Sequence, residues 1–291
     1  MSRALIFSLV AVAALIVVPA ALAVSFPARV LNALTSRSGY TIEPDIAYGD
    51  SARQRLDIYL PDKVDADTPV VVFFYGGGWN SGSRSGYLFV GQSLATAGMI
   101  VVIPDYRLYP EVVFPGFVDD AAKAVAFTRA RFKRPDGSTP PMFLAGHSAG
   151  AQIAALLNLD EHYLRDAGVP AKAIAGMIGL SGPYDFLPLK EDVYKATFPE
   201  AVRAASQPIA FVDGREPPML LLTGAADRTV RPANTTRLAA AIEAKGGKVE
   251  AKIYPGVRHI GTVAALSTLT PWKKPDVRQQ IIDFVQAPSL R

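Results

Sequence analysis

The chain has 291 residues, half of them hydrophobic, and this length and composition argue against disorder and indicate one large domain. Its formal net charge is only +4 and its lysines and arginines are scattered, so no nucleic acid is expected as a partner. The absence of cysteine excludes disulfides, thiolate nucleophiles and cysteine-based metal sites, and three isolated histidines give no metal-ligand spacing, so neither a metal nor a cofactor is expected.

The N-terminus is an uncharged, apolar segment that follows Arg3. It is long enough to cross a bilayer, which needs roughly 20 residues, but Ala-Leu-Ala at 21–23 has the small-x-small pattern of a signal-peptidase site. Residues 1–24 are therefore expected to be a cleaved signal peptide or a retained transmembrane helix, and residues 25–291 the folded domain. Because Arg3 favours an N-terminus that stays inside, we expect an exported domain, either periplasmic or anchored to the inner membrane and facing outward.

From Tyr40 onward, segments typical of strands alternate with segments of helical periodicity. The first two strands, 41–48 and 54–60, alternate polar and apolar residues, as expected of a half-exposed antiparallel pair. The later strands are short, nearly continuous apolar runs, which are typical of strands covered on both faces. Their ranges are 70–75, 99–106, 142–147, 175–182, 219–224 and 249–255.

Helices are predicted around the later strands, at 86–97, 116–133, 148–158, 232–245 and 275–287. This alternation predicts an α/β fold with a mostly parallel sheet of about eight strands and helices on both faces. A longer segment, 182–217, is rich in proline and aromatic residues and would lie at the carboxyl ends of the strands. It could cover a site there, or it could be a packed excursion with no part in binding.

The predicted strand at 70–75 ends abruptly in three glycines, Gly76, Gly77 and Gly78. Glycine lets the backbone adopt angles that a Cβ atom forbids, and it lets main-chain N–H groups come close to another group. The segment is consistent with a plain turn and also with a turn whose N–H groups face a ligand. Nothing within the segment decides between these two interpretations.

The pentapeptide GHSAG at 146–150 has the pattern G-x-S-x-G, and its context is that of a nucleophile elbow. It follows an apolar strand, MFLA, and opens a helical segment, AQIAALLNL. In such an elbow Ser148 takes a strained turn that lifts its hydroxyl clear of the sheet edge. The alternative is a tight strand-to-helix turn that holds an ordinary serine.

A nucleophilic serine needs a base within hydrogen-bond reach, and the chain offers three histidines. His259 follows the last strand at the sheet edge where the elbow also emerges, so it is the predicted base. His147 precedes Ser148 directly, and across a sharp elbow its side chain should point away from the reacting side of the serine. His162 lies in a polar helical stretch and is predicted to be a solvated surface residue.

The base is in turn expected to be oriented by a carboxylate. Asp227 follows the penultimate strand and lies between Ser148 and His259 in the sequence, which gives the chain order Ser, Asp, His that accompanies a nucleophile elbow. Asp185, one strand earlier, is the second candidate. Both positions are also compatible with an ordinary turn or helix cap, where aspartate is common.

Taken together, the motifs YGGGW, PDYRL, GHSAG, SGPYD, GAADRTV and RHIG occur in an order that resembles the α/β-hydrolase superfamily. The resemblance extends over about 40–286 and is closest to bacterial esterases of the hormone-sensitive-lipase-like and feruloyl-esterase-like (BD-FAE) groups. It implies an α/β-hydrolase catalytic domain at 25–291 that cleaves small-molecule carboxylic esters through an acyl-enzyme. The implied catalytic triad is Ser148, Asp227 and His259.

Two alternatives remain beside the esterase. An amidase or arylformamidase would use the same triad, because the leaving group is read by the shape of the pocket. A non-catalytic binding protein could keep the same fold without the activity. The chain retains all three triad residues, which favours an enzyme.

In these esterases an H-G-G-G loop after the third strand donates backbone N–H groups to the oxyanion. The resemblance therefore implies an oxyanion hole formed by the N–H groups of Gly77 and Gly78, together with that of Ala149 behind the nucleophile. Tyr75 stands where the family usually has histidine. Because that histidine mainly supports the loop in relatives, the difference is expected to affect the shape of the loop more than its chemistry.

Overall fold

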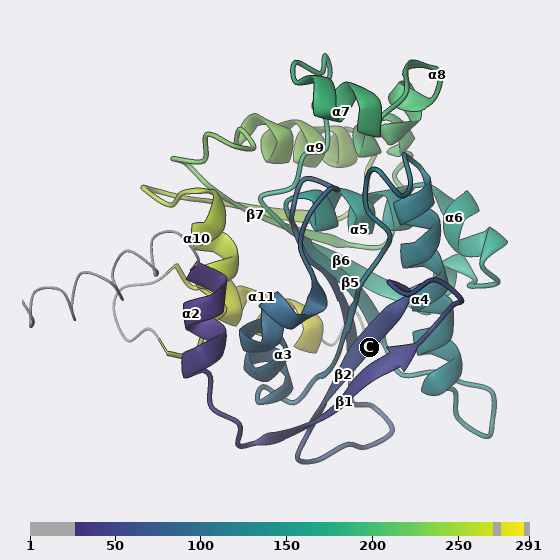
Figure 1. The fold of residues 1–291 in the computed structure, drawn as a ribbon, viewed down its shortest axis with the longest axis vertical. Coiled ribbons are helices and arrows are strands. Elements are labelled where there is room, and N and C mark those ends of the chain that lie inside the picture. The colour runs from purple at the N-terminus through teal and green to yellow at the C-terminus, as the bar shows by residue number, and fades with distance from the viewer. Residues whose placement is uncertain (1–26, 270–274, 288–291) are drawn as a thin grey trace, which may run out of the picture.

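The computed structural model describes residues 27–269 and 275–287 (Figure 1). The predicted signal peptide or membrane anchor, residues 1–24, lies outside the described residues. Within the described ranges, no helix is both long enough and apolar enough to cross a membrane.

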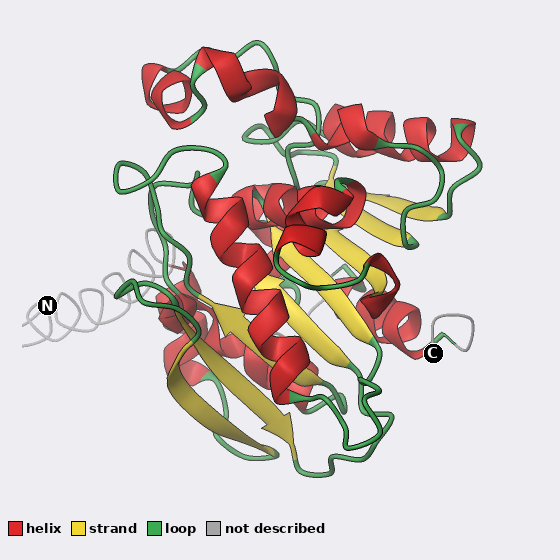
Figure 2. Ribbon diagram, turned by 90° about the vertical axis from the view of Figure 1, so that its right-hand side faces the viewer, coloured by secondary structure: helices red, strands yellow, loops and turns green. Residues whose placement is uncertain are grey.

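One eight-stranded sheet forms the centre of the fold (Figures 1 and 2). Its strands are β1 (Tyr40–Ala47), β2 (Arg55–Pro61), β3 (Val70–Phe74), β4 (Ile100–Pro104), β5 (Met142–His147), β6 (Ile174–Leu180), β7 (Met219–Gly224) and β8 (Val249–Tyr254). Their order across the sheet is β1-β2-β4-β3-β5-β6-β7-β8. β2 pairs antiparallel with β1 and with β4, and the remaining pairs are parallel. The predicted sheet, with its antiparallel opening pair, is confirmed.

Burial along the strands follows their position in the sheet. All residues of β3, β4, β5 and β7 are buried, as their continuous apolar sequences predict. β8 differs, because it is the edge strand and only Tyr254 in it is buried. The prediction that this strand is covered on both faces is therefore wrong. Glu250, Ala251 and Ile253 are exposed, so residues on both faces of this edge strand reach solvent.

Helices cover both faces of the sheet, as predicted (Figure 2). The α-helices are α2 (Pro27–Leu34), α3 (Leu88–Ala95), α4 (Gly116–Arg131), α5 (Ala149–Leu159), α6 (Glu161–Asp166), α7 (Asp192–Thr197), α8 (Glu200–Arg203), α9 (Ala233–Ala244), α10 (His259–Ala264) and α11 (Val277–Gln286). Short 3-10 helices are η1 (Arg84–Tyr87), η2 (Ala171–Ala173), η3 (Ala204–Ser206) and η4 (Pro208–Phe211). α3 and α11 pack together on one face, and α4 and α5 pack together on the other.

The segment 182–217, between β6 and β7, lies at the carboxyl ends of the strands, at the top of Figure 1, and we call it the cap. It contains α7, α8, η3 and η4. The rings of Phe186 and Phe198 pack against Trp79, with centroids 5.7 and 4.7 Å from that of the indole. Because Trp79 directly follows the three glycines, the cap covers this glycine segment rather than packing elsewhere.

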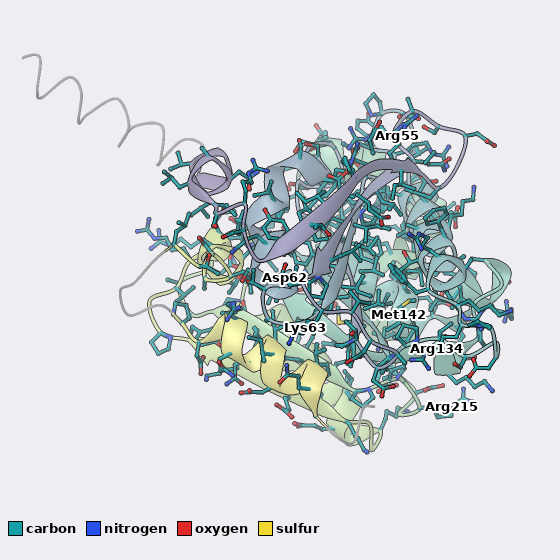
Figure 3. All side chains as sticks on the ribbon, turned by 90° about the horizontal axis from the view of Figure 1, so that it is seen from below. Arg55, Asp62, Lys63, Arg134, Met142 and Arg215 are labelled. Carbon is teal, nitrogen blue, oxygen red and sulfur yellow. The ribbon has the colours of Figure 1, made fainter. Side chains whose placement is uncertain are left out.

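The amino ends of the strands form the opposite edge of the sheet, which is seen from below in Figure 3. Met142, at the start of β5, is buried there, whereas Arg134 and Arg215 lie toward the rim. Two cavities of about 380 and 470 Å³ open at this edge and share Pro218 in their linings. Neither lining contains Ser148, Asp227 or His259, so these two cavities are not part of the predicted site.

Candidate active site

Ser148 lies in a sharp turn between β5 and α5, with φ 54° and ψ −123°. These angles are unusual for a residue with a Cβ atom, so the turn is strained and needs support from its neighbours. Two glycines make the turn possible. A Cβ atom on Gly146 would lie 2.3 Å from the carbonyl oxygen of Gly150, and one on Gly150 would lie 2.1 Å from that of Phe74. The turn therefore has the geometry of a nucleophile elbow.

Three side chains from three different segments meet at this turn. Ser148 Oγ lies 2.9 Å from His259 Nε2, and His259 Nδ1 lies 2.8 Å from Asp227 Oδ2. Because Nδ1–H donates to the carboxylate, Nε2 is left to accept the proton of the serine hydroxyl. His259 begins α10 rather than lying in an open loop, and only 12% of its side chain is exposed. The structure thus brings together the three residues that the sequence predicts as a triad.

The carboxylate of Asp227 is completely buried and well supplied with hydrogen bonds. Its Oδ1 atom accepts from the backbone N–H groups of Thr229, at 3.0 Å, and Val230, at 2.9 Å. Burial by itself raises the pKa of Asp227, but the hydrogen bonds from His259 and Val230 outweigh it and hold the pKa below its usual range. Asp227 is therefore an anion at neutral pH, as an orienting carboxylate must be.

The second candidate carboxylate, Asp185, has a different partner. Its Oδ2 atom lies 3.0 Å from Nε of Arg237 in α9, in an ion pair that solvent reaches. Its backbone N–H donates to the side chain of Asn234, also in α9, at 2.9 Å. Asp185 therefore ties the chain after β6 to α9, and it is Asp227 that contacts the imidazole of His259.

The other two histidines lie outside this chain of hydrogen bonds. His162 is partly exposed, and its Nδ1 atom lies 2.6 Å from Asp160, which fits a solvated surface residue. His147 is buried, and its Nε2 atom donates to the carbonyl oxygen of His259 at 3.2 Å. Burial, reinforced by the neighbouring His259, lowers the pKa of His147 to about 3, so this side chain is neutral. Sequence reasoning missed this contact, which joins residues 112 positions apart.

The three glycines belong to a loop, residues 75–82, which we call the glycine loop. The backbone N–H groups of Asn80 and Ser81, and the hydroxyl of Ser81, all donate to the carbonyl oxygen of Gly77. Because the C=O and N–H of a trans peptide point in opposite directions, the N–H of Gly78 faces away from this internal turn. The N–H groups of Gly77 and Gly78 donate to no residue in the described part of the chain. Both are therefore available to a ligand.

The glycine loop runs directly beside the nucleophile. A Cβ atom on Gly76 would lie 3.0 Å from the Cβ atom of Ser148. Gly77 has φ 147° and Gly78 has φ 59°, which are angles that favour glycine. Ala149 is the first residue of α5, so its N–H has no acceptor within the helix. This arrangement fits N–H groups that face a ligand better than it fits a plain turn.

Trp79 connects the glycine loop to the nucleophile's helix and to the cap. Its Nε1 atom donates to Oε1 of Gln152 at 3.0 Å, and Nε2 of Gln152 donates to the carbonyl oxygen of Ser206 at 2.9 Å. The ring of Tyr194 in α7 meets the indole edge-on, and its hydroxyl would lie 3.3 Å from a Cβ atom on Gly78. Nothing in the sequence indicates the roles of Gln152 and Tyr194, because they contact Trp79 only when the fold brings separate segments together.

Tyr75 is buried behind the glycine loop. Its hydroxyl donates to Oδ1 of Asp105 at 2.8 Å and accepts from Nη2 of Arg53 at 2.8 Å. Its ring is stacked between those of Tyr87 and Tyr106, with centroid distances of 5.6 and 4.8 Å. The side chain thus supports the loop from behind, which is the role that the resemblance implies for this position.

These parts provide a nucleophile, a base held by an anion, and backbone donors on either side of the nucleophile. They are the groups needed to attack a carbonyl carbon and to bind the oxyanion that forms. Among the described residues, no group of three or more histidine, aspartate or glutamate side chains is placed to hold a metal ion.

Comparisons with known proteins place this arrangement in a family. The BD-FAE family model matches residues 56–242, which include the glycine loop, Ser148 and Asp227. The isoprenylcysteine alpha-carbonyl methylesterase of Arabidopsis thaliana is 30% identical over 241 residues, which cover 75% of this chain and 56% of that protein. The kynurenine formamidase of Danio rerio is 30% identical over 145 residues, which cover 50% of this chain and 47% of that protein. The chain thus spans about half the length of these curated relatives.

A solved structure supports the same fold. A truncated form of a carbohydrate esterase from gut microbiota aligns with a TM-score of 0.75 and 19% identity, over 88% of this chain and 99% of that chain. At this level of identity the likeness concerns the fold alone. It agrees with the eight-stranded, mostly parallel sheet and the helices on its faces. Since the family match extends from β2 to α9 and includes the glycine loop and the elbow, the chain belongs to the BD-FAE family of the α/β-hydrolase superfamily.

Proposed function

We propose that this protein is a serine hydrolase that cleaves carboxylic esters through an acyl-enzyme. The observation that carries the proposal is the unbroken chain of hydrogen bonds from Ser148 through His259 to Asp227. This chain of hydrogen bonds lies next to the backbone N–H groups of Gly77 and Gly78, which donate to no residue in the described part of the chain. Together these groups supply a nucleophile, a base and an oxyanion site within one small volume.

In the acylation step, Ser148 Oγ attacks the carbonyl carbon of the ester while His259 Nε2 takes the hydroxyl proton. The carbonyl oxygen becomes an anion, which binds the N–H groups of Gly77, Gly78 and Ala149. Each such donor typically contributes ~3 kcal/mol, because the developing charge meets dipoles that already point at it. Collapse of the tetrahedral intermediate breaks the bond to the alcohol oxygen, which takes the proton from His259. The acyl group stays on Ser148.

In the deacylation step, a water molecule takes the place of the alcohol. His259 accepts a proton from the water, whose oxygen attacks the acyl carbon. The second tetrahedral intermediate releases the carboxylic acid and returns the proton to Ser148 Oγ. Asp227 remains ionised throughout, because its hydrogen bonds hold its pKa below the usual range, and its charge stabilises the imidazolium that forms in each step.

An amide, in particular an aryl formamide, is the second candidate substrate. The observation that favours it is the similarity to a kynurenine formamidase. The same triad can cleave an amide, with the amine leaving in place of the alcohol. That similarity covers 50% of the chain, whereas the similarity to the methylesterase covers 75%, and for this reason we place esters first.

A substrate panel tests the proposal. The purified protein is assayed with the p-nitrophenyl esters of a short and a long acid and with an aryl formamide, and Ser148→Ala serves as the matched control. Hydrolysis of an ester that is lost in Ser148→Ala supports the proposal. Hydrolysis of the formamide alone would assign the protein as an amidase. Hydrolysis that persists in Ser148→Ala would contradict both assignments.

We also propose that residues 1–24 direct export of the domain, on the basis of the apolar segment and the Ala-Leu-Ala sequence at 21–23. The protein would then act in the periplasm or at the outer face of the inner membrane. N-terminal sequencing after expression in a bacterial host, with membranes separated, tests this. A chain that begins at Val24 indicates a cleaved signal, and a membrane fraction with intact Met1 indicates an anchor. Intact protein in the cytosol would refute both.

A further inference from the structure

We propose that Arg53 is a positioning residue for the oxyanion site, because its guanidinium joins the two ends of the glycine loop. The inference rests on the proposed function, since it concerns the loop whose N–H groups bind the oxyanion. Arg53 lies in the connection between β1 and β2, far in sequence from Ser148, Asp227 and His259.

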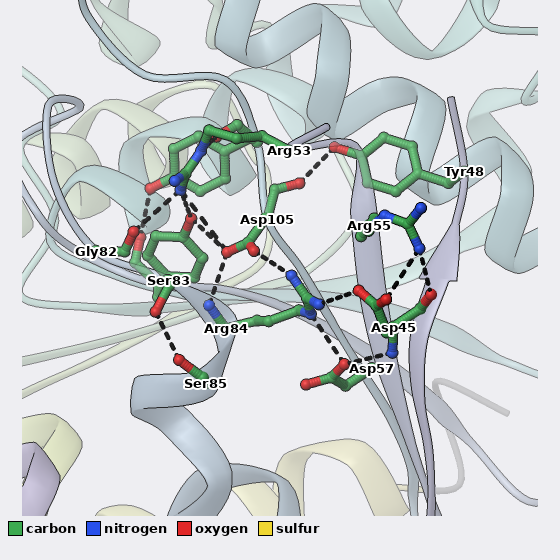
Figure 4. A network of polar contacts seen from close by, with 12 residues as sticks. Asp45, Tyr48, Arg53, Arg55, Asp57, Gly82, Ser83, Arg84, Ser85 and Asp105 are labelled. Atoms are coloured by element: carbon green, nitrogen blue, oxygen red, sulfur yellow. Dashed lines mark hydrogen bonds and ion pairs between the residues drawn. The ribbon is translucent and has the colours of Figure 1, made fainter. Parts of the chain in front are cut away.

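The contacts of Arg53 converge on the base of the glycine loop. Its Nη2 atom donates to the hydroxyl of Tyr75 at 2.8 Å. The same atom donates to the carbonyl oxygen of Gly82 at 3.0 Å (Figure 4). Tyr75 is the first residue of the loop and Gly82 is the last. The Nε atom of Arg53 donates to the carbonyl oxygen of Tyr106 at 2.9 Å, and the hydroxyl of Tyr106 donates to the carbonyl oxygen of Tyr75 at 2.7 Å. One guanidinium therefore spans the start and the end of the loop.

The two ends of the loop already touch at this point. A Cβ atom on Gly82 would lie 2.8 Å from the carbonyl oxygen of Gly76 and 2.9 Å from the ring of Tyr75. Gly82 has φ 103°, an angle that residues with a side chain rarely adopt. Only a glycine lets the loop close so tightly. The contact of Tyr75 and Gly76 with Gly82 closes the base of the loop, and we call this contact the neck. The guanidinium of Arg53 hydrogen-bonds to residues on both sides of the neck.

The buried carboxylate of Asp105 binds Tyr75 on the side of the neck that faces the protein interior. Burial, together with Asp105, raises the pKa of Tyr75 far above its usual range, so the phenol stays protonated and donates to Asp105. Asp105 also accepts from the backbone N–H of Arg84 at 2.7 Å and forms an ion pair with the guanidinium of Arg84 (Figure 4). The Tyr75 hydroxyl therefore lies between a donor, Arg53, and an acceptor, Asp105. Histidine has no hydroxyl and a shorter side chain, so it could not make this pair of contacts in the same way.

The neck controls the N–H groups because little backbone separates them from it. The carbonyl oxygen of Gly77 accepts hydrogen bonds from the internal turn at Ser81, and the carbonyl oxygen of Gly76 lies against Gly82. The peptides that carry the N–H groups of Gly77 and Gly78 lie between these two fixed points. A misplacement of about 1 Å can cost on the order of 100-fold in rate, since an oxyanion site depends on exact donor positions. A loosened neck should therefore lower turnover more than it lowers substrate binding.

Arg55 provides a matched control. It lies two residues further along, at the start of β2, and its Nη1 atom bonds to the carboxylate and the carbonyl oxygen of Asp45. Its side chain is 41% exposed, against 30% for Arg53. Its replacement by alanine removes the same charge from the same β1–β2 hairpin, but it leaves the contacts of the glycine loop intact.

The test compares Arg53→Ala, Arg53→Lys and Arg55→Ala in the full chain. Three properties are measured: kcat and KM for an ester, the inhibition constant of a trifluoromethyl ketone that forms a tetrahedral adduct with the serine, and amide hydrogen exchange of the glycine loop. We expect Arg53→Ala to lower kcat by about 10- to 100-fold with little change in KM, and to weaken the ketone by a similar factor. Exchange in the loop should rise. Arg53→Lys should be intermediate, because one ammonium cannot reproduce the fork of a guanidinium.

The control separates positioning from general stability. Arg55→Ala should match the wild type in all three measurements. If Arg53→Ala leaves all three measurements at the wild-type level, or if Arg55→Ala has the same effect as Arg53→Ala, the inference is wrong. If Arg53→Ala does not fold, Arg53→Lys carries the test, and loop exchange at the wild-type level in that variant would overturn the inference. A wild type without esterase or amidase activity would instead overturn the proposed function. The exchange measurement needs no activity, so it would still test whether Arg53 orders the loop.

Discussion

The hydroxyl of Tyr75 donates a hydrogen bond of 2.8 Å to the carboxylate of Asp105, and this bond commits it to a buried network behind the glycine loop. The resemblance of the glycine loop to an H-G-G-G motif implies a histidine at this position. The structure shows how tyrosine can replace it, because the phenol reaches Asp105 and Arg53 while its backbone continues into the three glycines. The side chain of Tyr75 thus supports the loop, and the proposed binding of the oxyanion is left to the backbone.

This separation predicts unequal effects of two substitutions in the glycine loop. Gly78→Val adds a branched side chain at φ 59°, where it is strained, and should shift the N–H donor and lower kcat by about 10²–10³-fold. Tyr75→Phe removes a hydroxyl that makes two hydrogen bonds, to Asp105 and from Arg53, each worth about 1 kcal/mol, so it should lower the rate by no more than about 30-fold. Turnover of one ester, with folding checked by thermal melts, compares the two. Equal losses would make the hydroxyl itself a candidate oxyanion donor.

The choice between the two carboxylates predicts a second difference. Asp227→Asn replaces the anion that holds His259 with a neutral amide and should lower kcat by about 10⁴-fold while the fold is kept. Asp185→Asn weakens only a solvent-reached ion pair with Arg237 and should leave kcat within about twofold. The comparison needs kcat and a circular dichroism spectrum for each variant. The reverse ranking would assign the acid to Asp185.

The buried His147 predicts a dependence of stability on pH. Its pKa is about 3 in the folded protein and about 6.5 when exposed, so below pH 6.5 the unfolded chain binds a proton that the folded chain does not. This difference should lower the free energy of unfolding by about 2 kcal/mol between pH 7 and pH 5. Urea titrations at the two pH values measure the loss.

His147→Gln is the matched variant for this measurement. The amide nitrogen of glutamine can replace Nε2 as the donor to the carbonyl oxygen of His259, but it does not titrate. The variant should therefore lose about 2 kcal/mol less than the wild type between pH 7 and pH 5. The same pH dependence in both proteins would mean that His147 takes up a proton in the folded state.

The triad predicts non-additive losses. Ser148→Ala and His259→Ala should each remove nearly all ester hydrolysis, because the serine is a weak nucleophile without its base. The double variant should be hardly slower than either single variant, since the two residues act as one unit. Initial rates at high enzyme concentration test this. Multiplied losses in the double variant would show that the two residues contribute independently.

The elements that could be predicted from the sequence are those with a local cause. The elbow around Ser148 has glycines at 146 and 150 because a Cβ atom at either position would collide with backbone, and this requirement appears in the sequence as a spacing. β3, β4, β5 and β7 are fully buried, so their sequences are continuous apolar runs. The alternation of charges in β8 was present as well, and Glu250 and Lys252 could have identified an edge strand.

Contacts between distant segments left no such pattern. Arg53 contacts both ends of the glycine loop from the β1–β2 hairpin, and nothing near it in the sequence distinguishes it from Arg55. His147 contacts the backbone of His259 only because the elbow and α10 meet at the same sheet edge. Such residues become visible only when the fold brings their segments together.

The most direct test of the account is the identity of the residue that becomes covalently modified. The protein is incubated with a fluorophosphonate, whose phosphorus is attacked in the same way as an ester carbonyl, and the modified peptide is identified by mass spectrometry. The account predicts one phosphonyl group per chain, located on Ser148, with modification absent in Ser148→Ala and strongly slowed in His259→Ala. An adduct on another residue, or ester hydrolysis by a protein whose Ser148 stays unmodified, would contradict it.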